Sequence, residues 1–158
     1  MYRVSKQLWF CSAHQVRLSE TECEAMHGHN YRVLVHAEAR ELDRTSYVID
    51  FAELKKAAVE ICGRFDHANI NEVEPFREGE RNPTAEELAR FLCEQLGRRF
   101  DDARVRISKV EVYETDNNRA EWTPEEQASS ATGAGRRPEH PEEQASPATG
   151  AGRKPEHQ

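Results

Sequence analysis

Alternating apolar and polar residues mark the first part of the chain as β structure. Two stretches carry this pattern, residues 2–11 and residues 31–39. Successive side chains of a strand point to opposite faces, so each stretch predicts a strand with one apolar face. A third apolar run at 47–49 follows the polar turn 41–44, and we expect it to pair with the second strand. The sequence therefore begins with an antiparallel meander.

The periodicity then changes to one typical of helices. Asp50 can cap a helix over residues 51–63, in which apolar residues fall at helical spacing and a glycine stands at the end. After a loop-like segment, Thr84 opens a capping box. The apolar stripe that follows predicts a second helix that ends near Gly97.

Strand character returns in the last part of the body. Alternation runs from Val105 to Glu114 but changes phase at 108–109, which is typical of a β-bulge. A short strand near 118–122 follows. The order of strands, two helices and strands predicts an α+β domain with an antiparallel sheet.

The end of the chain has a different composition. Residues 124–140 and 141–157 form a 17-residue tandem repeat that differs at two positions, and alanine is its only apolar residue. Such a segment buries too little apolar surface to offset its ordering entropy, so we expect a disordered tail over 124–158. The remaining 1–123 is predicted to form one domain. It is too small to enclose a deep pocket alone, which favours an oligomer.

Charge and cysteine content exclude several classes of function. The net charge is −7 and the body has no basic run or basic aromatic face, so we expect no nucleic-acid partner. No apolar run approaches the roughly 20 residues of a membrane-spanning helix, so no membrane association is expected. The four cysteines form no CxxC pair, and Met1 is not followed by a charged-then-apolar leader. These features predict a cytoplasmic protein.

Histidines 27 and 29 are the most informative polar residues. In an extended strand they point to the same face, and Gly28 between them leaves the opposite face uncrowded. Two imidazoles at this spacing form half of a metal site, and His14 on a neighbouring strand is the expected third ligand. Three nitrogen ligands with an open position are typical of catalytic zinc. We therefore predict Zn²⁺ at His14, His27 and His29, and no such role for His36.

Cys23 lies four residues before His27 and has three possible roles. It could be a buried side chain that only fills space. It could be a fourth zinc ligand, which would close the site and make it structural. A thiol near the metal but not bound to it would be acidified and could act as a base. Spacing alone does not separate these roles.

Two further groups have the chemistry of acid–base catalysis or ligand binding. Asp66 stands beside His67, and a carboxylate can orient an imidazole and stabilise its protonated form, although such pairs also occur by chance. Glu114 falls on the apolar face of its strand, where an acid is costly unless paired. It is either at the solvated rim of the sheet or the partner of a donor-rich ligand.

Taken together, these segments resemble the 6-pyruvoyltetrahydropterin synthase family, which includes the 6-carboxytetrahydropterin synthases. The resemblance covers nearly the whole body and keeps the family's order, whereas the tail has no counterpart. It is carried by FCSAH at 10–14, CEAMHGHNY at 23–31, VIDF at 48–51, FDHANIN at 65–71, NPTAE at 82–86 and VYET at 112–115.

The resemblance implies a role for each candidate residue. The implied zinc ligands are His14, His27 and His29, the implied catalytic residues are Cys23, Asp66, His67 and Glu114, and the implied substrate-binding residues are Glu114 and Thr84. Cys23 would be the general base, with Asp66 and His67 as its relay partners. Glu114 would hold the guanidine-like edge of a pterin, because a carboxylate can accept two parallel N–H bonds.

The resemblance also implies a fold and an assembly. The fold would be a four-stranded antiparallel sheet with two helices on one face, the tunnelling fold. Three sheets would join into a barrel, and two trimers would stack into a homohexamer. Such an assembly agrees with a body that is too small to build its own pocket.

The short spacing between Cys23 and His27 resembles the carboxy-forming branch, since the pyruvoyl-forming enzymes have a longer insertion there. The implied function is a zinc-dependent lyase that converts 7,8-dihydroneopterin triphosphate to 6-carboxy-5,6,7,8-tetrahydropterin, acetaldehyde and triphosphate, in 7-deazaguanine (queuosine-type) biosynthesis. The alternatives are a 6-pyruvoyltetrahydropterin synthase, a zinc-stabilised pterin- or purine-binding module without turnover, and a tail that recruits a partner protein. The sequence does not rank the possible triphosphate ligands, which are Arg32, Lys55, Lys56 and Arg119.

Overall fold

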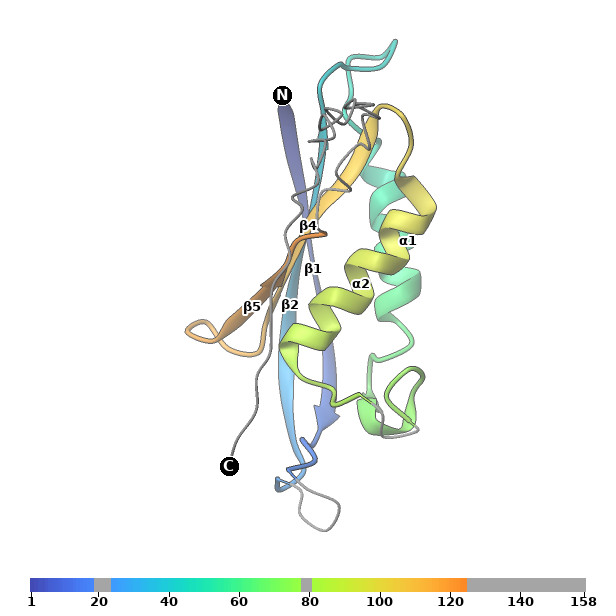
Figure 1. The fold of residues 1–158 in the computed structure, drawn as a ribbon. Coiled ribbons are helices and arrows are strands. Elements are labelled where there is room, and N and C mark those ends of the chain that lie inside the picture. The colour runs from blue at the N-terminus through green and yellow to red at the C-terminus, as the bar shows by residue number, and fades with distance from the viewer. Residues whose placement is uncertain (19–23, 78–80, 125–158) are drawn as a thin grey trace, which may run out of the picture. The chain divides into compact units, whose positions relative to one another are not determined.

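The computed structural model describes residues 1–18, 24–77 and 81–124. Within them the chain forms five strands, two α-helices and one turn of 3₁₀ helix (Figure 1). In chain order these elements are β1 (Tyr2–His14), β2 (His27–Ala39), α1 (Phe51–Cys62), β3 (Ala68–Asn69), η1 (Ile70–Glu72), α2 (Ala85–Phe100), β4 (Val105–Tyr113) and β5 (Arg119–Trp122). None of the described helices is long and apolar enough to cross a membrane. The predicted tail lies outside the described residues except for Pro124, so that prediction stays untested.

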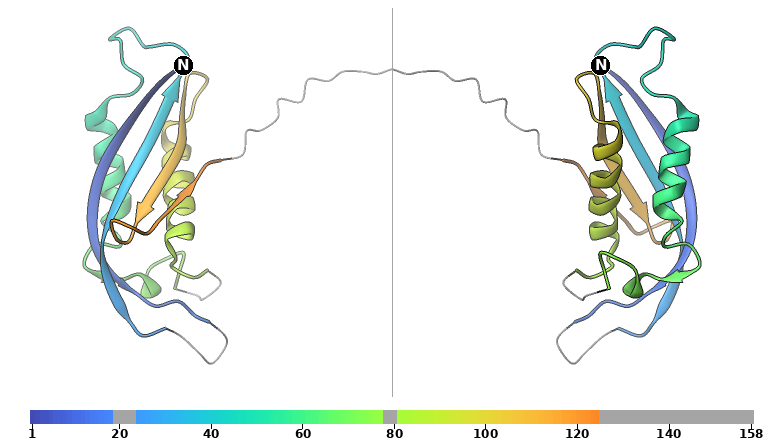
Figure 2. Two further views of the ribbon diagram at one scale, coloured as in Figure 1. Left: turned by 90° about the vertical axis from the view of Figure 1, so that its left-hand side faces the viewer. Right: turned by 90° about the vertical axis from the view of Figure 1, so that its right-hand side faces the viewer.

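The strands form one sheet in the order β3-β1-β2-β4-β5. β1 and β2 are antiparallel along their full length, with Tyr2 opposite Ala39 and His14 opposite His27. β4 is antiparallel to β2, β5 is antiparallel to β4, and β3 is parallel to β1. Both helices cover the same face of the sheet (Figures 1 and 2). The predicted α+β class is confirmed, and the two-residue β3 makes the sheet five-stranded instead of four-stranded.

Strand alternation places the apolar side chains of the sheet under the helices. Tyr31, Val33, Val35 and Ala37, at alternate positions of β2, are fully buried. The helices supply the opposite wall of the core with Leu54, Ala57, Ala58, Leu88, Leu92 and Leu96. A shift of one residue in β2 would turn its buried side chains, and the histidines that follow the same alternation, to the other face. The core therefore fixes the direction in which the candidate site faces.

Both helices begin at the predicted caps. The Asp50 side chain accepts a hydrogen bond from the backbone N–H of Ala52, and Thr84 accepts one from the N–H of Glu87. Each bond satisfies one of the donors that a helix leaves unpaired at its start. α1 ends at Cys62, one residue before the predicted end, and Gly63 is its C-cap.

The prediction that α2 ends near Gly97 is wrong, because the helix continues to Phe100. A Cβ at position 97 would lie 3.0 Å from a carboxylate oxygen of Asp101. The backbone N–H of Asp101 also donates to the carbonyl of Gly97 and caps the helix. The glycine here allows a close approach and does not end the helix.

The predicted strand at 47–49 is also wrong. The position beside β2 is taken by β4, and residues 41–50 form bends and turns instead. The Asp43 carboxylate accepts the N–H groups of Thr45 and Tyr47 and closes one of these turns. The last two residues of the apolar run are buried against the core, so burial and not strand pairing explains their hydrophobicity.

The predicted bulge in β4 is confirmed. His36 of β2 lies opposite Lys109, whereas the next residue, Ala37, lies opposite Ile107. Ser108 is therefore the extra residue. The bulge keeps the apolar side chains of β4 under the helices on both sides of the phase change.

A buried carboxylate, Glu111, lies on the open face of the sheet and is surrounded by donors. Its oxygens lie 2.9 Å from Nζ of Lys109 and 2.8 Å from Nε2 of His36. The Tyr113 hydroxyl donates to it at 3.0 Å, and Arg119 pairs with it as well. Burial alone would raise the pKa of the Glu111 carboxyl, but the bonds from Lys109 and Tyr113 outweigh burial and lower the pKa to about 2. The sequence analysis did not single out this residue.

We expect Glu111 to make the stability of the protein depend on pH. Its pKa in the folded state lies below the ordinary value of 4.5, so its stabilisation is complete above 4.5 and is lost as the pH falls towards 2. The shift corresponds to about 3 kcal/mol. In urea titrations of the metal-free protein, the free energy of unfolding should exceed that of Glu111→Gln at pH 6, and the difference should shrink by about 3 kcal/mol on going to pH 2. A difference that does not change with pH would contradict this account.

Candidate metal centre

Three histidines converge at one end of the β1–β2 ladder. His14 lies directly opposite His27, and Ser12 lies opposite His29, so the three imidazoles project from neighbouring positions of one face. Their ligand nitrogens lie within 4.8 Å of one another. Among the described residues, these three form the one group of His, Cys, Asp and Glu side chains that is spaced to hold a metal ion.

Hydrogen bonds to backbone carbonyls fix the tautomers of two of these histidines. Nδ1 of His14 lies 2.6 Å from the carbonyl oxygen of Pro83, and Nδ1 of His27 lies 2.9 Å from that of Ala25. A carbonyl oxygen only accepts, so each Nδ1 carries the hydrogen and each Nε2 presents its lone pair. The two Nε2 atoms face each other at 3.1 Å. Two lone pairs at this distance repel each other unless a metal ion lies between them or one imidazole takes up a second proton and donates to the other.

His29 completes the set of donors. Its Nε2 is buried and has no hydrogen-bond partner within the described part of the chain. Burial lowers the pKa of His29, the charge of Glu114 opposes this effect, and His14 and His27 add to it. A neutral imidazole is the form that binds a metal ion. The residues therefore fit a divalent cation held by three nitrogens, and a tetrahedral ion would keep its fourth position for another ligand.

Side-chain amides hold the end of β1 in place. Asn71 accepts from the backbone N–H of Gln15 and donates to its carbonyl, both at 2.9 Å. Asn82 makes the same pair of bonds with the backbone of Arg17, at 2.9 and 3.0 Å. These bonds tie the chain after β1 to the segment that contains Pro83. Both asparagines lie in the family segments, but nothing local in a sequence identifies such a partner.

Glu114 lies beside the histidines. It follows β4 and continues the face of Val112, as the alternation predicted. Its Oε1 lies 3.9 Å from Nε2 of His14, and its side chain is 23% exposed. The carboxylate therefore contacts both the imidazole cluster and the solvent, so it can meet a ligand that approaches the metal position.

Tyr31 lies behind this group. Its ring centroid is 5.4 Å from that of His29 and 5.9 Å from that of His14, in both cases edge to face. Burial raises the pKa of Tyr31 well above its usual range, and the negative charge of Glu114 raises it further. The phenol is therefore a neutral hydrogen-bond donor at any pH in the physiological range.

The predicted relay pair lies next to β1, just before β3. Asp66 accepts the backbone N–H of Cys11 at 2.9 Å, and the N–H of His67 donates to the carbonyl of Cys11 at 2.6 Å. The imidazole of His67 is 82% exposed and lies 3.9 Å from Asp66. It lines a hollow of about 520 Å³ together with Cys11, Asn30 and His29. Within one chain, His67 therefore shares a hollow with one of the three candidate metal ligands.

Of the two remaining predicted site residues, Cys23 and Thr84, the structure describes only Thr84. Cys23 lies outside the described residues, so its role stays a prediction. Thr84 is at the start of α2, where its hydroxyl oxygen accepts the N–H of Glu87 at 3.3 Å. It follows Pro83 directly, so it lies next to the carbonyl that orients His14.

The four candidate triphosphate ligands divide into two sets. Lys55 and Lys56 are exposed on α1. Arg32 and Arg119 lie on the open face, where the guanidinium of Arg32 stacks 4.0 Å from the ring centroid of Tyr113 and Arg119 pairs with the buried carboxylate described above.

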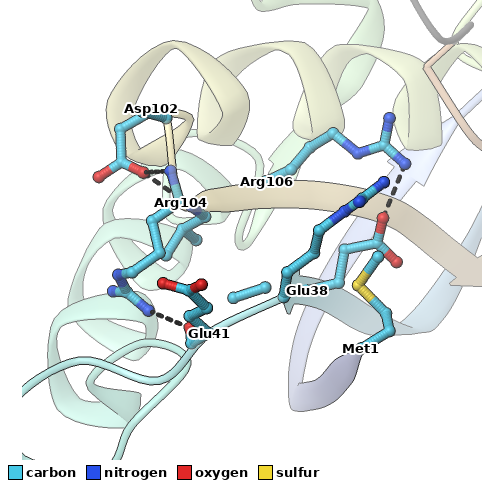
Figure 3. A pocket seen from close by; sticks show the side chains of 10 residues that line it. Met1, Glu38, Glu41, Asp102, Arg104 and Arg106 are labelled. Atoms are coloured by element: carbon cyan, nitrogen blue, oxygen red, sulfur yellow. Dashed lines mark hydrogen bonds and ion pairs between the residues drawn. The ribbon is translucent and has the colours of Figure 1, made fainter.

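A second hollow, of about 560 Å³, lies at the opposite end of the β1–β2 ladder (Figure 3). Its charges are paired within the protein: Glu38 lies 2.7 Å from Arg106 and 3.1 Å from Arg3. Partial burial opposes ionisation of Glu38, but these two bonds outweigh it and lower the pKa of the carboxyl. Arg104 donates to the carbonyl of Glu41 at 3.2 Å. Because Glu38 is paired with two arginines, we assign no ligand to this hollow.

Removal of one imidazole should abolish tight metal binding. We expect His29→Ala to lower zinc affinity at least about 100-fold, since even partners of metal ligands contribute 10- to 100-fold. The matched control is His36→Ala, which removes a histidine of the same strand from the other face and should leave zinc affinity unchanged. Competition with a chromophoric chelator measures both. Equal affinity of the two variants would rule out this metal centre.

Comparison with known proteins agrees with the fold. Residues 3–125 match the 6-pyruvoyl tetrahydropterin synthase family. The chain is 28% identical over 115 residues to 6-carboxy-5,6,7,8-tetrahydropterin synthase of Bacillus subtilis, a match that covers 71% of this chain and 77% of that protein. It is 29% identical over 116 residues to dihydroneopterin monophosphate aldolase of Pyrococcus furiosus, covering 72% of this chain and 87% of that protein.

A solved structure supports the same fold. The 6-pyruvoyl tetrahydropterin synthase of Caenorhabditis elegans matches with a TM-score of 0.67 and 23% identity, over 78% of this chain and 95% of that chain. The family match spans most of the chain and includes all three histidines of the metal centre. The chain therefore belongs to the 6-pyruvoyl tetrahydropterin synthase family.

Proposed function

We propose that this protein is a zinc-dependent lyase that converts 7,8-dihydroneopterin triphosphate and water to 6-carboxy-5,6,7,8-tetrahydropterin, acetaldehyde and triphosphate. The observation that carries the proposal is the approach of the Nε2 atoms of His14 and His27 to 3.1 Å, with both Nδ1 hydrogens held by carbonyls. Family membership and the similarity to named 6-carboxytetrahydropterin synthases support the choice of reaction. The proposed setting is 7-deazaguanine biosynthesis in the cytoplasm.

Zinc is the metal that these donors suit best, because three imidazoles with one open position are its usual catalytic site. When bound, it would lower the pKa of the hydroxyl groups on the substrate's side chain and stabilise negative charge on their oxygens. The protein's contribution is orientation, since the carbonyls of Pro83 and Ala25 keep the donor nitrogens directed at one point.

Glu114 is proposed to hold the pterin ring. A carboxylate can accept two parallel N–H bonds from the 2-amino group and N3 of the ring. Its partial exposure and its distance of 3.9 Å from His14 would place a bound ring next to the metal position. Thr84 is proposed to add a hydroxyl from the start of α2, because its oxygen has a second lone pair beside the one that caps the helix.

Cys23 is proposed as the general base, and Asp66 and His67 as the pair that relays protons. Because the imidazole of His67 is 82% exposed beside β1, we propose that a second copy of the chain completes this part of the site. In the proposed homohexamer, one protomer would supply His67 to the histidine cluster of a neighbour. A homo-oligomer, and not a monomer, is thus the proposed active form.

Three alternatives differ in what they release from the same class of substrate. A 6-pyruvoyltetrahydropterin synthase would eliminate triphosphate and keep the three-carbon side chain. An aldolase, the activity named for the Pyrococcus furiosus relative, would cut the side chain and release a two-carbon aldehyde that still carries phosphate. A zinc-stabilised binding module would release nothing.

We expect the zinc-loaded protein to release acetaldehyde and triphosphate in equal amounts from dihydroneopterin triphosphate. Acetaldehyde is measured by NADH oxidation with alcohol dehydrogenase, and the pterin product by mass spectrometry. Triphosphate without acetaldehyde would indicate the pyruvoyl-forming reaction, and a phosphorylated two-carbon aldehyde would indicate the aldolase. Any of these results, or the absence of products, would overturn the proposed reaction.

Cys23→Ala should keep zinc and lose turnover by a factor of about 100 or more, which is the usual contribution of a general base. The control is Cys93→Ala, whose thiol is buried between α2 and β4 and should affect neither property. Zinc content by atomic absorption and the acetaldehyde assay provide the two measurements. Loss of zinc and of folded structure in Cys23→Ala would instead identify a closed, structural site.

A further inference from the structure

The hydroxyl of Tyr31 is a polar group enclosed beneath the histidine cluster. Tyr31 follows His29 on the same face of β2, and its side chain is fully buried. Its ring stacks on Phe10 with a centroid distance of 4.9 Å and an interplanar angle of 15°. The hydroxyl oxygen has no hydrogen-bond partner among the described residues.

Burying a hydroxyl without a partner is unfavourable, because the group loses its hydrogen bonds to water. A phenylalanine could occupy the same volume and stack on Phe10 in the same way without this cost. Packing alone therefore does not explain the phenol at position 31. The hydroxyl is best explained by an acceptor that reaches it in the working state of the site.

Glu114 is the acceptor that the surroundings offer. The Nδ1 atoms of His14 and His27 are engaged with carbonyls, and their Nε2 lone pairs point at the metal position. The carboxylate of Glu114 lies 3.9 Å from Nε2 of His14, and the ring centroid of His14 lies 5.9 Å from that of Tyr31. The Glu114 side chain is partly exposed, whereas Tyr31 is fully enclosed. The phenol can therefore act on a ligand only through another residue.

We propose that Tyr31 is a positioning residue for Glu114: its O–H donates to one carboxylate oxygen and fixes the plane of the carboxylate. In that orientation the remaining lone pairs are directed at a pair of parallel N–H groups, such as the amino-pyrimidine edge of a pterin. The inference rests on the proposed role of Glu114 as the pterin anchor. Tyr31 ends the family segment 23–31, and the inference assigns this residue a role that the metal centre does not explain.

The test compares Tyr31→Phe with Tyr47→Phe in the full-length, zinc-loaded protein. Tyr47 is 54% exposed in the loop between β2 and α1, so its variant controls for the loss of a phenol away from the site. We expect Tyr31→Phe to raise KM for dihydroneopterin triphosphate about tenfold, the factor that one hydrogen bond is worth, with a smaller change in kcat. Its zinc content should be unchanged, and its melting temperature should be equal or higher, because an unpaired buried hydroxyl has been removed.

A double-mutant cycle with Glu114→Ala separates this inference from the proposed function. If Tyr31 acts through Glu114, Tyr31→Phe should have no further effect on KM in the Glu114→Ala background. Binding of neopterin, followed by fluorescence, gives the same comparison without turnover. Unchanged KM and neopterin affinity in Tyr31→Phe, with a loss in Glu114→Ala, would overturn the inference and leave the anchor role intact. No loss in Glu114→Ala would overturn the anchor role itself, and loss of zinc or lowered melting temperature in Tyr31→Phe would show a structural role instead.

Discussion

Two backbone carbonyl groups determine the chemistry at the histidine end of the sheet. By accepting hydrogen bonds from Nδ1 of His14 and His27, the carbonyls of Pro83 and Ala25 leave both Nε2 lone pairs facing each other. The other tautomer of either imidazole would direct an N–H at the same point and repel a cation. Pro83 lies between Asn82, whose side-chain amide bonds to the backbone of Arg17, and the start of α2. The direction of the His14 donor nitrogen therefore depends on the fold.

The sheet separates two kinds of chemistry onto its two faces. The face under the helices carries the apolar core and, at its end, the imidazoles with Glu114 and Tyr31. The open face carries ion-paired side chains. His67 lies in the turn before β3, where its imidazole is 82% exposed. This exposure is the physical reason to propose that neighbouring copies complete the active site.

Local patterns in the sequence correctly predicted the structural features that depend on residues close together in the chain. The helix caps at Asp50 and Thr84 and the bulge at Ser108 follow from residue chemistry and periodicity, and the structure confirms them. The prediction for 47–49 was wrong because β4 took the place beside β2. The predicted end at Gly97 was wrong because the helix continues to Phe100, where the backbone N–H of Asp101 caps it. The three histidines could be grouped because strand alternation places two of them together. No periodicity marks the interactions that join residues far apart in sequence. These are the bond between His14 and the Pro83 carbonyl, the bonds of the Asn71 and Asn82 amides to the backbone after β1, and the ion pairs of Glu111.

X-ray absorption spectroscopy of the zinc-loaded protein tests the metal centre most directly, because it reports the atoms bound to the ion without reference to activity. The account predicts a first shell of three nitrogen scatterers and one oxygen at about 2.0–2.1 Å, with no sulfur. A sulfur scatterer at about 2.3 Å would show that the thiol of Cys23 occupies the position left for the substrate, and the site would then be structural. Fewer than three nitrogen ligands would contradict the convergence of imidazoles on which the proposed function depends.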